Sequence, residues 1–345
     1  MTEFDTLLKP ILDNLQFSPE QPVVVVDQLP IGYGGQLSRR LLGLKIALAI
    51  NRKAVFLADG DKPYVQSIER QFASNFGEEA LHGAPLLKLD GGHDAPKIVQ
   101  LDYFEAQKKL RAENLLLEKW VEKRLAEKHS LSANDLAKLD GWLLSWIRFL
   151  PEFEEQLRQD TDRLGVCTTT LGVHLRRGDK HVESPYVPAS LINKAIHQIH
   201  RNWPFESIFL ASDDPEADSV IEAPTGVRIV FDKTEKRYNN ANHKMLMANP
   251  KIAAQETYVA FKNLRLLAQC GGIVGQDNAH FATIAASHIL YKGGNSDRVV
   301  LLNGNAAKAD SALIQTYYVL KLNLRKAAKQ ILPAGVIRFI NRATY

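Results

Sequence analysis

The apolar residues near the N-terminus form two short continuous runs separated by a stretch of helical spacing. Residues 23–26 are four consecutive valines, which is typical of a strand buried on both faces of a parallel sheet. Leucine and isoleucine then recur at helical spacing over 38–51, and the run AVFLA occupies 54–58. A glycine-bearing loop, 30–36, separates the first run from the helix. This order predicts the strand–loop–helix–strand unit of an α/β protein.

The rest of the chain predicts a helical block followed by a second α/β series. Residues from about 104 to 164 combine dense charge with helical apolar spacing. Helical segments over 190–200 and 255–268 fit between later apolar runs. The runs that we interpret as strands are 166–175, 208–211, 227–231 and 273–274. We therefore predict two Rossmann-like halves with a cleft between them.

Length and composition agree with two folded domains. The chain has 345 residues, of which 45% are apolar and 24% charged, so wholesale disorder is excluded. At roughly 150 residues for an average domain, this length corresponds to about two. We assign 1–165 to an N-terminal Rossmann-like domain with the helical block. Residues 166–310 form a C-terminal Rossmann-like domain, and 311–345 form basic amphipathic C-terminal helices.

Charge and cysteine content exclude several classes of protein. The formal net charge is +4, far from the strongly basic balance of a dedicated nucleic-acid binder. Cys167 and Cys270 are too few for a disulfide framework or a four-cysteine zinc site, which favours a reducing, cytoplasmic location. The acidic N-terminus is unlike a secretory signal, and without a run of 18 apolar residues we expect no transmembrane helix.

The last residues of the chain are basic and amphipathic. After Asp310 the sequence has no acidic residue, and apolar positions separate its cations. Such a helix can lie on an anionic membrane surface or pack across the two domains. The first alternative predicts peripheral contact with the inner membrane. The cations are Lys321, Arg325, Lys326, Lys329, Arg338 and Arg342.

The first α/β unit imitates a dinucleotide-binding motif. A strand precedes Gly32-x-Gly34, a helix follows, and the next strand ends at Asp59. However, Leu37 stands where that motif has its third glycine, so the signal is weak. An NAD(P)-dependent oxidoreductase that uses the 23–61 unit is one alternative, and a structural glycine turn is another.

The segment LGVHLRRGDK contains the most informative cluster of charges. His174 and Arg176 alternate with apolar residues, so in a strand they share one face near its carboxyl end. Arg176 and Arg177 offer planar guanidinium donors for phosphate oxygens. Asp179 can orient an arginine, and Lys180 adds another cation. The alternative is a solvated turn with salt bridges.

A pair of acids, Asp213 and Asp214, follows the 208–211 run. Adjacent aspartates can hold a metal ion, but at a strand end they more often cap the next helix, and Pro215 favours capping. Because arginines can neutralise a diphosphate, we predict no metal.

Four blocks in one order resemble the GDP-fucose-dependent fucosyltransferases, both the α1,6 enzymes and the related α1,2 enzymes. HLRRGDK is similar to their HxRR-type motif, and GYGGQL, residues 32–37, is similar to their glycine-rich GxGxQL loop. IFLASDDP, residues 208–215, resembles their strand-plus-acid segment. The helix at 142–165 is similar in pattern to the one that leads into the arginine motif. The resemblance covers about residues 22 to 290.

The resemblance implies a GT-B fold with two facing Rossmann-like domains and an inverting, metal-independent transfer from GDP-fucose to a glycan. It places the donor in the C-terminal domain, 166–310, and the acceptor on the side of the N-terminal domain, 1–165. With the tail at a membrane, a lipid-linked glycan or lipopolysaccharide of bacterial type would suit as acceptor. In this family pattern Arg176 is the main ligand of the β-phosphate, and His174 lies near the guanine. Glu183 falls at the position of the general base, with His181 as the competing base. The segment placed beside the nucleotide from the opposing domain comprises Gly32, Tyr33, Gly34 and Gly35.

Of the other aligned positions, some keep the family pattern and others depart from it. Asp213 and Asp214 match the acidic pair that holds the donor pocket together. Asn263 stands where the α1,6 enzymes have a guanine-reading aspartate, and Asn278 and Ala279 stand where serines usually meet the phosphate. These departures leave open a non-catalytic nucleotide-sugar or glycan-binding protein on the same scaffold.

Overall fold

The computed structural model describes residues 2–26, 32–56, 84–87, 96–113, 115–147, 150–176, 187–214, 216–235 and 249–303. Its strands are β1 Val23–Val26, β2 Lys53–Phe56, β3 Ile98–Leu101, β4 Thr170–Leu175, β5 Ser207–Ser212, β6 Arg228–Val230, β7 Gly272–Gln276 and β8 Val299–Leu302. Its longer helices are α1 Glu3–Leu7, α2 Lys9–Phe17, α3 Tyr33–Ile50, α5 Tyr103–Ala112, α6 Leu117–His129, α7 Ala133–Leu144, α8 Pro151–Leu164, α9 Ala189–Asn202, α11 Pro250–Gln269 and α12 His280–Tyr291. Short 3-10 turns, η2 Ala217–Val220 and η3 Ser296–Arg298, complete the described elements.

The first sheet has the order β2-β1-β3, with parallel pairing throughout. Its centre is the four-valine run, which is buried on both faces as predicted. Val24 and Val26 belong to the large core on one face, while Val23 and Val25 belong to a small core on the other. The second strand begins at Lys53, one residue before the predicted 54–58, and is described as far as Phe56; residues 57 and 58 lie outside the described residues. The sequence analysis missed β3, because IVQL is a run of four residues interrupted by a polar glutamine.

Helix α3 begins at Tyr33, five residues earlier than the sequence predicts. Gly32 is its N-cap, and the N–H groups of Gly35 and Gln36 both donate to the Gly32 carbonyl. The glycines therefore form the first helical turn, although glycine disfavours a helix by about 1 kcal/mol per residue. The helix ends at Asn51, whose φ of 54° is left-handed.

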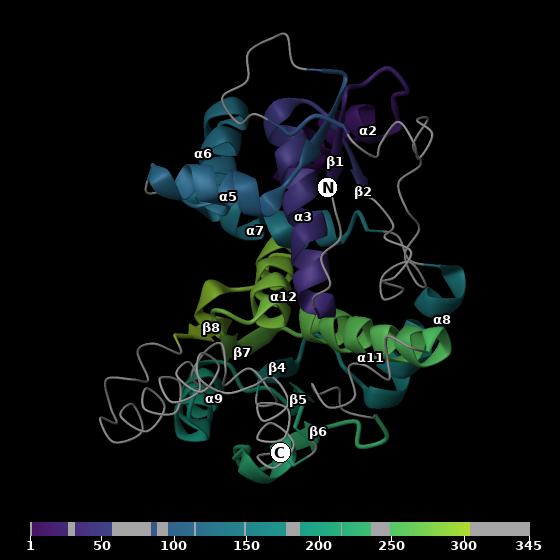
Figure 1. Cartoon of the computed structure of the whole chain (residues 1–345). Coiled ribbons are helices and arrows are strands. Elements are labelled where there is room, and N and C mark those ends of the chain that lie inside the picture. Colours follow the sequence, from purple (N-terminus) through teal and green to yellow (C-terminus); the bar gives the residue numbers. More distant parts are fainter. Residues whose placement is uncertain are drawn as a thin grey trace, which may run out of the picture.

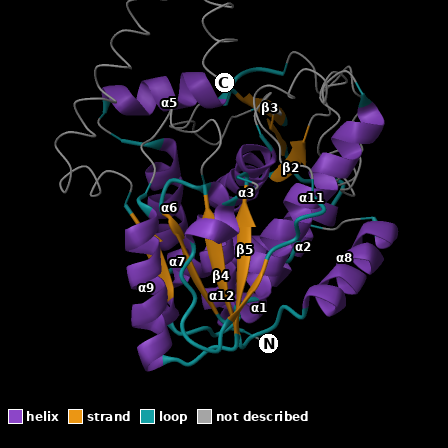
Figure 2. Ribbon diagram, turned by 90° about the horizontal axis from the view of Figure 1, so that it is seen from below, coloured by secondary structure: helices purple, strands orange, loops and turns teal. Residues whose placement is uncertain are grey.

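The second sheet is parallel and has the order β6-β5-β4-β7-β8. Helix α9 covers one face, where Ile192 and Ile196 pack with Leu171 and Val173. Helices α11 and α12 cover the other face, and Figure 2 shows β4 and β5 between α9 and these helices. The predicted strands and helices of this half are confirmed with shifts of a few residues, and β8 is an addition.

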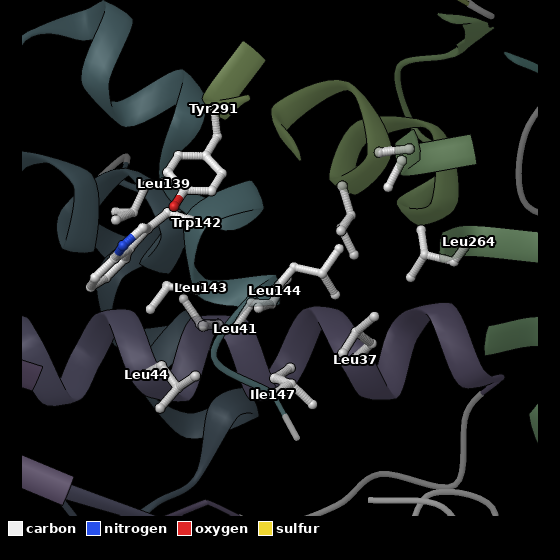
Figure 3. Close-up of a cluster of buried hydrophobic side chains, with 14 of the residues drawn as sticks. Leu37, Leu41, Leu44, Leu139, Trp142, Leu143, Leu144, Ile147, Leu264 and Tyr291 are labelled. Carbon is white, nitrogen blue, oxygen red and sulfur yellow. The ribbon is translucent and has the colours of Figure 1, made fainter. Parts of the chain in front are cut away.

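A single large core joins the two halves. It contains Leu37 and Leu41 of α3 and Trp142 of α7 together with Leu264 of α11. Figure 3 shows these side chains in one cluster along α3, with Trp142 toward one end and Leu264 toward the other, and Figure 1 shows α3 extending from the first sheet to α11 and α12. The predicted helical block over 104–164 is confirmed as α5 to α8.

Helices α7 and α12 approach each other closely at Gly141. A Cβ atom there would lie 2.3 Å from the backbone N and Cα of His288, so α7 and α12 touch where a side chain is absent. Gly141 N–H donates to Ser287 Oγ at 2.8 Å, and that hydroxyl donates to the Ala137 carbonyl at 2.7 Å. Hydrogen bonds and packing therefore fasten the helical block to the second sheet.

The α/β architecture with two parallel sheets confirms the predicted fold class. The two sheets fall on either side of residue 165, and the division into domains at that residue stays a prediction. The predicted C-terminal helices of 311–345 lie outside the described residues.

Candidate functional site

The order of strands in the second sheet creates a topological switch point at the carboxyl edge of the sheet. Leaving β4, the chain adds β5 and β6 on one side, and it then adds β7 and β8 on the other. In open parallel sheets, ligands bind outside the carboxyl ends of the strands at such a switch point. The switch point here lies between β4, which ends beside Arg176, and β7, which ends at Gln276.

Arg176 is held by an acid from the neighbouring strand. Leu175 of β4 is in register with Ser212 of β5, so the residues that follow them, Arg176 and Asp213, are neighbours. Arg176 Nη1 lies 2.7 Å from Asp213 Oδ2. The aspartate side chain is largely buried, which fixes the position of the guanidinium at the sheet edge.

Asp214 makes a different contact from Asp213. Its Oδ1 accepts a hydrogen bond of 2.9 Å from the N–H of Glu216, directly before the turn η2. Ser212 Oγ accepts from the Asp214 N–H and donates to the Leu175 carbonyl. Asp214 therefore closes a turn ahead of η2 and does not cap it, because the N-cap of η2 is Glu216 and has no side-chain cap, whereas Asp213 pairs with the arginine.

His174 is a buried, neutral imidazole next to this ion pair. Only 8% of its surface is exposed, and Nδ1 has no hydrogen-bond partner within the described part of the chain. Burial, with a smaller contribution from the charge of Arg176, lowers the pKa of His174 to about 3. A buried polar atom without a partner is costly in a folded protein and often marks a ligand contact. His174 therefore offers a neutral hydrogen-bonding group at the switch point.

Phe281 links His174 to the first half of the molecule. Its ring centre lies 5.7 Å from that of His174 and 6.3 Å from that of Tyr33, which it meets edge to face. A Cβ atom at Gly34 would lie 2.9 Å from Phe281 ring atoms and 3.4 Å from His280 Cβ. Gly34 is thus required by the close approach of α12, which supports the structural interpretation of that glycine. Sequence reasoning missed Phe281. The signal that could have identified it is its position in the first helical turn after a predicted strand.

Two helix N-termini converge at this contact. Neither Gly32, the N-cap of α3, nor Ala279, the N-cap of α12, provides a side-chain cap. The first N–H groups of a helix carry partial positive charge and bind anions such as phosphate. Ala279 is buried and Asn278 is exposed in the turn between β7 and α12. The structure thus brings the glycine segment, the Asn278 turn, His174 and Arg176 to one junction.

Asn263 lies in a cluster of ionic side chains between α8, α11 and the segment after β6. Its Nδ2 donates to both carboxylate oxygens of Glu235, at 3.1 and 3.0 Å, and to the Val259 carbonyl. The adjacent Lys262 is 2.6 Å from Glu235 and 3.0 Å from Asp232. The amide nitrogen of Asn263 is therefore committed to protein partners.

The remaining predicted site residues lie outside the described part of the chain: Arg177, Asp179, Lys180, His181 and Glu183. Among the residues that are described, no three or more histidine, cysteine or acidic side chains cluster as metal ligands. Over the same residues, no helix is long and apolar enough to span a membrane.

The chain was also compared with known proteins. No protein-family model matches it, and no curated protein sequence matches it. Among solved structures it is similar to a NodZ α-1,6-fucosyltransferase soaked with GDP-fucose, with TM-score 0.43 and 12% identity over 78% of this chain and 93% of that one. It is similar to POFUT1 in its apo form, with TM-score 0.43 and 13% identity over 83% and 98%. A mutant of Arabidopsis thaliana FUT1 in complex with GDP gives TM-score 0.44 and 11% identity over 81% and 72%.

Proposed function

We propose that the protein is an inverting, metal-independent glycosyltransferase that moves fucose from GDP-fucose to a glycan hydroxyl, in an α1,6-type linkage. The observation behind this proposal is the junction at the carboxyl end of β4, where the Arg176–Asp213 pair and His174 meet two helix N-termini without side-chain caps. Guanidinium and helix N-termini together suit a diphosphate. The choice of GDP-fucose rests on the sequence motifs around this junction.

The transfer needs one group that stabilises the leaving diphosphate and another that accepts the proton of the acceptor hydroxyl. The bond between the sugar C1 and the β-phosphate oxygen breaks, and the acceptor oxygen bonds to C1 from the opposite face. Arg176 stabilises the charge that develops on the leaving diphosphate, and one such donor contributes about 3–4 kcal/mol. Arg177 and Lys180 assist it. Glu183 accepts the proton of the acceptor hydroxyl.

Ligand binding and turnover test this proposal together. GDP and GDP-fucose should raise the melting temperature of the protein, whereas NAD and NADP should not, and slow release of GDP from GDP-fucose should be detectable. Arg176→Ala should abolish that release while the circular dichroism spectrum stays unchanged. Full activity in Arg176→Ala would overturn the assignment. Stabilisation by NAD alone would favour the oxidoreductase, and donor binding without any GDP release would favour a non-catalytic binding protein.

We also propose a cytoplasmic location with the tail at an anionic membrane surface. Both cysteines are free, with Cys167 exposed, which suits a reducing compartment. The six cations after Asp310 have no acidic neighbours in the sequence, and each contributes about 1 kcal/mol to binding near an anionic surface. The full chain should co-sediment with phosphatidylglycerol vesicles but not with phosphatidylcholine vesicles, and removal of 311–345 should abolish the difference.

A further inference from the structure

A pocket of about 140 Å³ lies at the carboxyl ends of β1 and β3. The first sheet has its own switch point there, because β2 flanks β1 on one side and β3 on the other. Val26, Leu42 and Leu101 supply apolar walls. This place is therefore suited by topology to a ligand, and none of the groups assigned to the donor lines it.

The polar wall of the pocket is rigid and has no net positive charge. Arg39 stacks on Tyr103, with its Cζ 3.1 Å from the ring centre. The Tyr103 hydroxyl donates to Glu118 Oε1 at 3.0 Å, and the same oxygen lies 3.8 Å from Arg39 Nη1. Glu118 offsets the charge of Arg39, and Asp102 adds another carboxylate to the lining. The pocket therefore disfavours a phosphate or carboxylate ligand and offers fixed partners for hydroxyl groups.

Phe104 provides an aromatic surface beside these polar groups. It lines the pocket and is 66% exposed, the highest value among the large apolar side chains that the structure describes. Its ring meets Tyr103 edge to face at 5.7 Å, which fixes its orientation. A neutral sugar ring matches this arrangement, because one face has C–H groups that stack on an aromatic ring while its hydroxyls reach polar neighbours.

The pocket lies near the proposed donor junction. Arg39 follows Gly32 by seven residues on α3, and at 1.5 Å per residue the two are about 10 Å apart along the helix axis. We propose that this pocket binds a neutral sugar ring of the acceptor saccharide, stacked on Phe104 and hydrogen-bonded near Arg39 and Asp102. The identification of this sugar as the acceptor rests on the proposed function, whereas the binding of a neutral sugar does not.

Saturation-transfer NMR on the full chain tests the proposal. The probes are the methyl glycosides of glucose, galactose, mannose and N-acetylglucosamine, with glucose 6-phosphate as the anionic comparison. At least one neutral glycoside should give a signal that falls at least fivefold in Phe104→Ala and in Arg39→Ala. Phe17→Ala is the matched control, because Phe17 is 65% exposed on α2 and does not line the pocket. GDP binding should be the same in all variants.

The outcomes separate this proposal from the proposed function. The sugar-pocket proposal is overturned if no neutral glycoside gives a signal that depends on Phe104. It is also overturned if glucose 6-phosphate gives a stronger signal than the neutral glycosides. Both conclusions hold even if GDP binds. Phe104-dependent sugar binding without GDP binding leaves the pocket in place and removes the transferase assignment. If acceptor turnover is then measured, Phe104→Ala should raise the acceptor KM about tenfold and leave the donor KM unchanged.

Discussion

Arg176 and Asp213 form an ion pair of 2.7 Å between the ends of two neighbouring parallel strands. The register of Leu175 with Ser212 places the two residues side by side, and no loop conformation is needed to bring them together. A guanidinium held in this way keeps its donors oriented before a ligand arrives, which reduces the entropy lost on binding.

Removing the acid should weaken nucleotide binding. In Asp213→Asn the guanidinium of Arg176 loses its charged partner, so we expect the Kd for GDP to rise about tenfold and the free energy of unfolding to fall by about 1–3 kcal/mol. Titration calorimetry and urea unfolding measure the two effects. Asp218→Asn, which breaks the more exposed Asp218–Lys233 pair of 2.6 Å, is the control and should leave GDP binding unchanged. Equal GDP affinity in Asp213→Asn would show that the pair does not orient Arg176 for a ligand.

The burial of His174 predicts how stability depends on pH. Its pKa is about 3 in the folded protein against about 6.5 in an unfolded chain. Between these values the unfolded state binds more protons, so stability falls as the pH decreases from 6.5, at about 1.4 kcal/mol per unit. His288, with a pKa lowered to about 4 chiefly by burial, acts in the same direction.

The contribution of His174 can be isolated by comparing two pH values. The loss of unfolding free energy between pH 7.5 and pH 5 should be smaller in His174→Gln than in the wild type, by about 2 kcal/mol. His197→Gln on α9 controls for the loss of an imidazole, and proton NMR of the wild type should show a His174 signal that does not shift between pH 5 and 8. A His174 signal that titrates near pH 6.5 would contradict the buried, neutral assignment.

The sequence predicted the sheets better than the contacts between them. Buried valines in β1 and the alternation around His174 follow from periodicity, whereas the switch point depends on the order of strands in the sheet, which the sequence analysis did not predict. The meeting of Gly34 with Phe281 could not be predicted, because the two residues are far apart in the chain and approach only when α12 packs on α3. The predicted start of α3 at 38 is too late for the same reason. The packing that favours a helix over Gly34 and Gly35 cannot be inferred from local helix propensity.

Asn263 has contacts that its place in the motif does not reveal. The resemblance aligns it with a guanine-reading position, which stays a prediction, and its amide nitrogen donates to Glu235 in the segment after β6. The partner of a helix residue depends on which neighbouring segment reaches it, and the spacing of residues along α11 contains no information about that segment.

A methyl group at Gly34 should disturb the junction between the two halves. In Gly34→Ala the new Cβ would lie 2.9 Å from the ring of Phe281, whose retreat is limited by His174 and Tyr33. We expect a loss of about 1–3 kcal/mol in the free energy of unfolding. Gly32→Ala is the matched control, since nothing lies within 4 Å of its Cβ position. The double variant Gly34→Ala/Phe281→Leu should recover part of the loss; additive effects in this urea-unfolding cycle would be evidence against the contact.

A methyl group at Gly141 should have a larger effect, because it meets backbone and not a side chain. Its Cβ would lie 2.3 Å from N and Cα of His288, so α7 and α12 must separate. Separation also stretches the bond from Gly141 N–H to Ser287 Oγ. We expect Gly141→Ala to lose about 3 kcal/mol or more, at the upper end for overpacking. Ser287→Ala should lose about 0.5–1.5 kcal/mol, because it removes the hydroxyl that accepts from Gly141 N–H and donates to the Ala137 carbonyl. Because one core spans both sheets, wild-type urea unfolding should be a single transition by fluorescence and circular dichroism. Two wild-type transitions, or a loss below 1 kcal/mol in Gly141→Ala, would mean that the sheets fold independently of this contact.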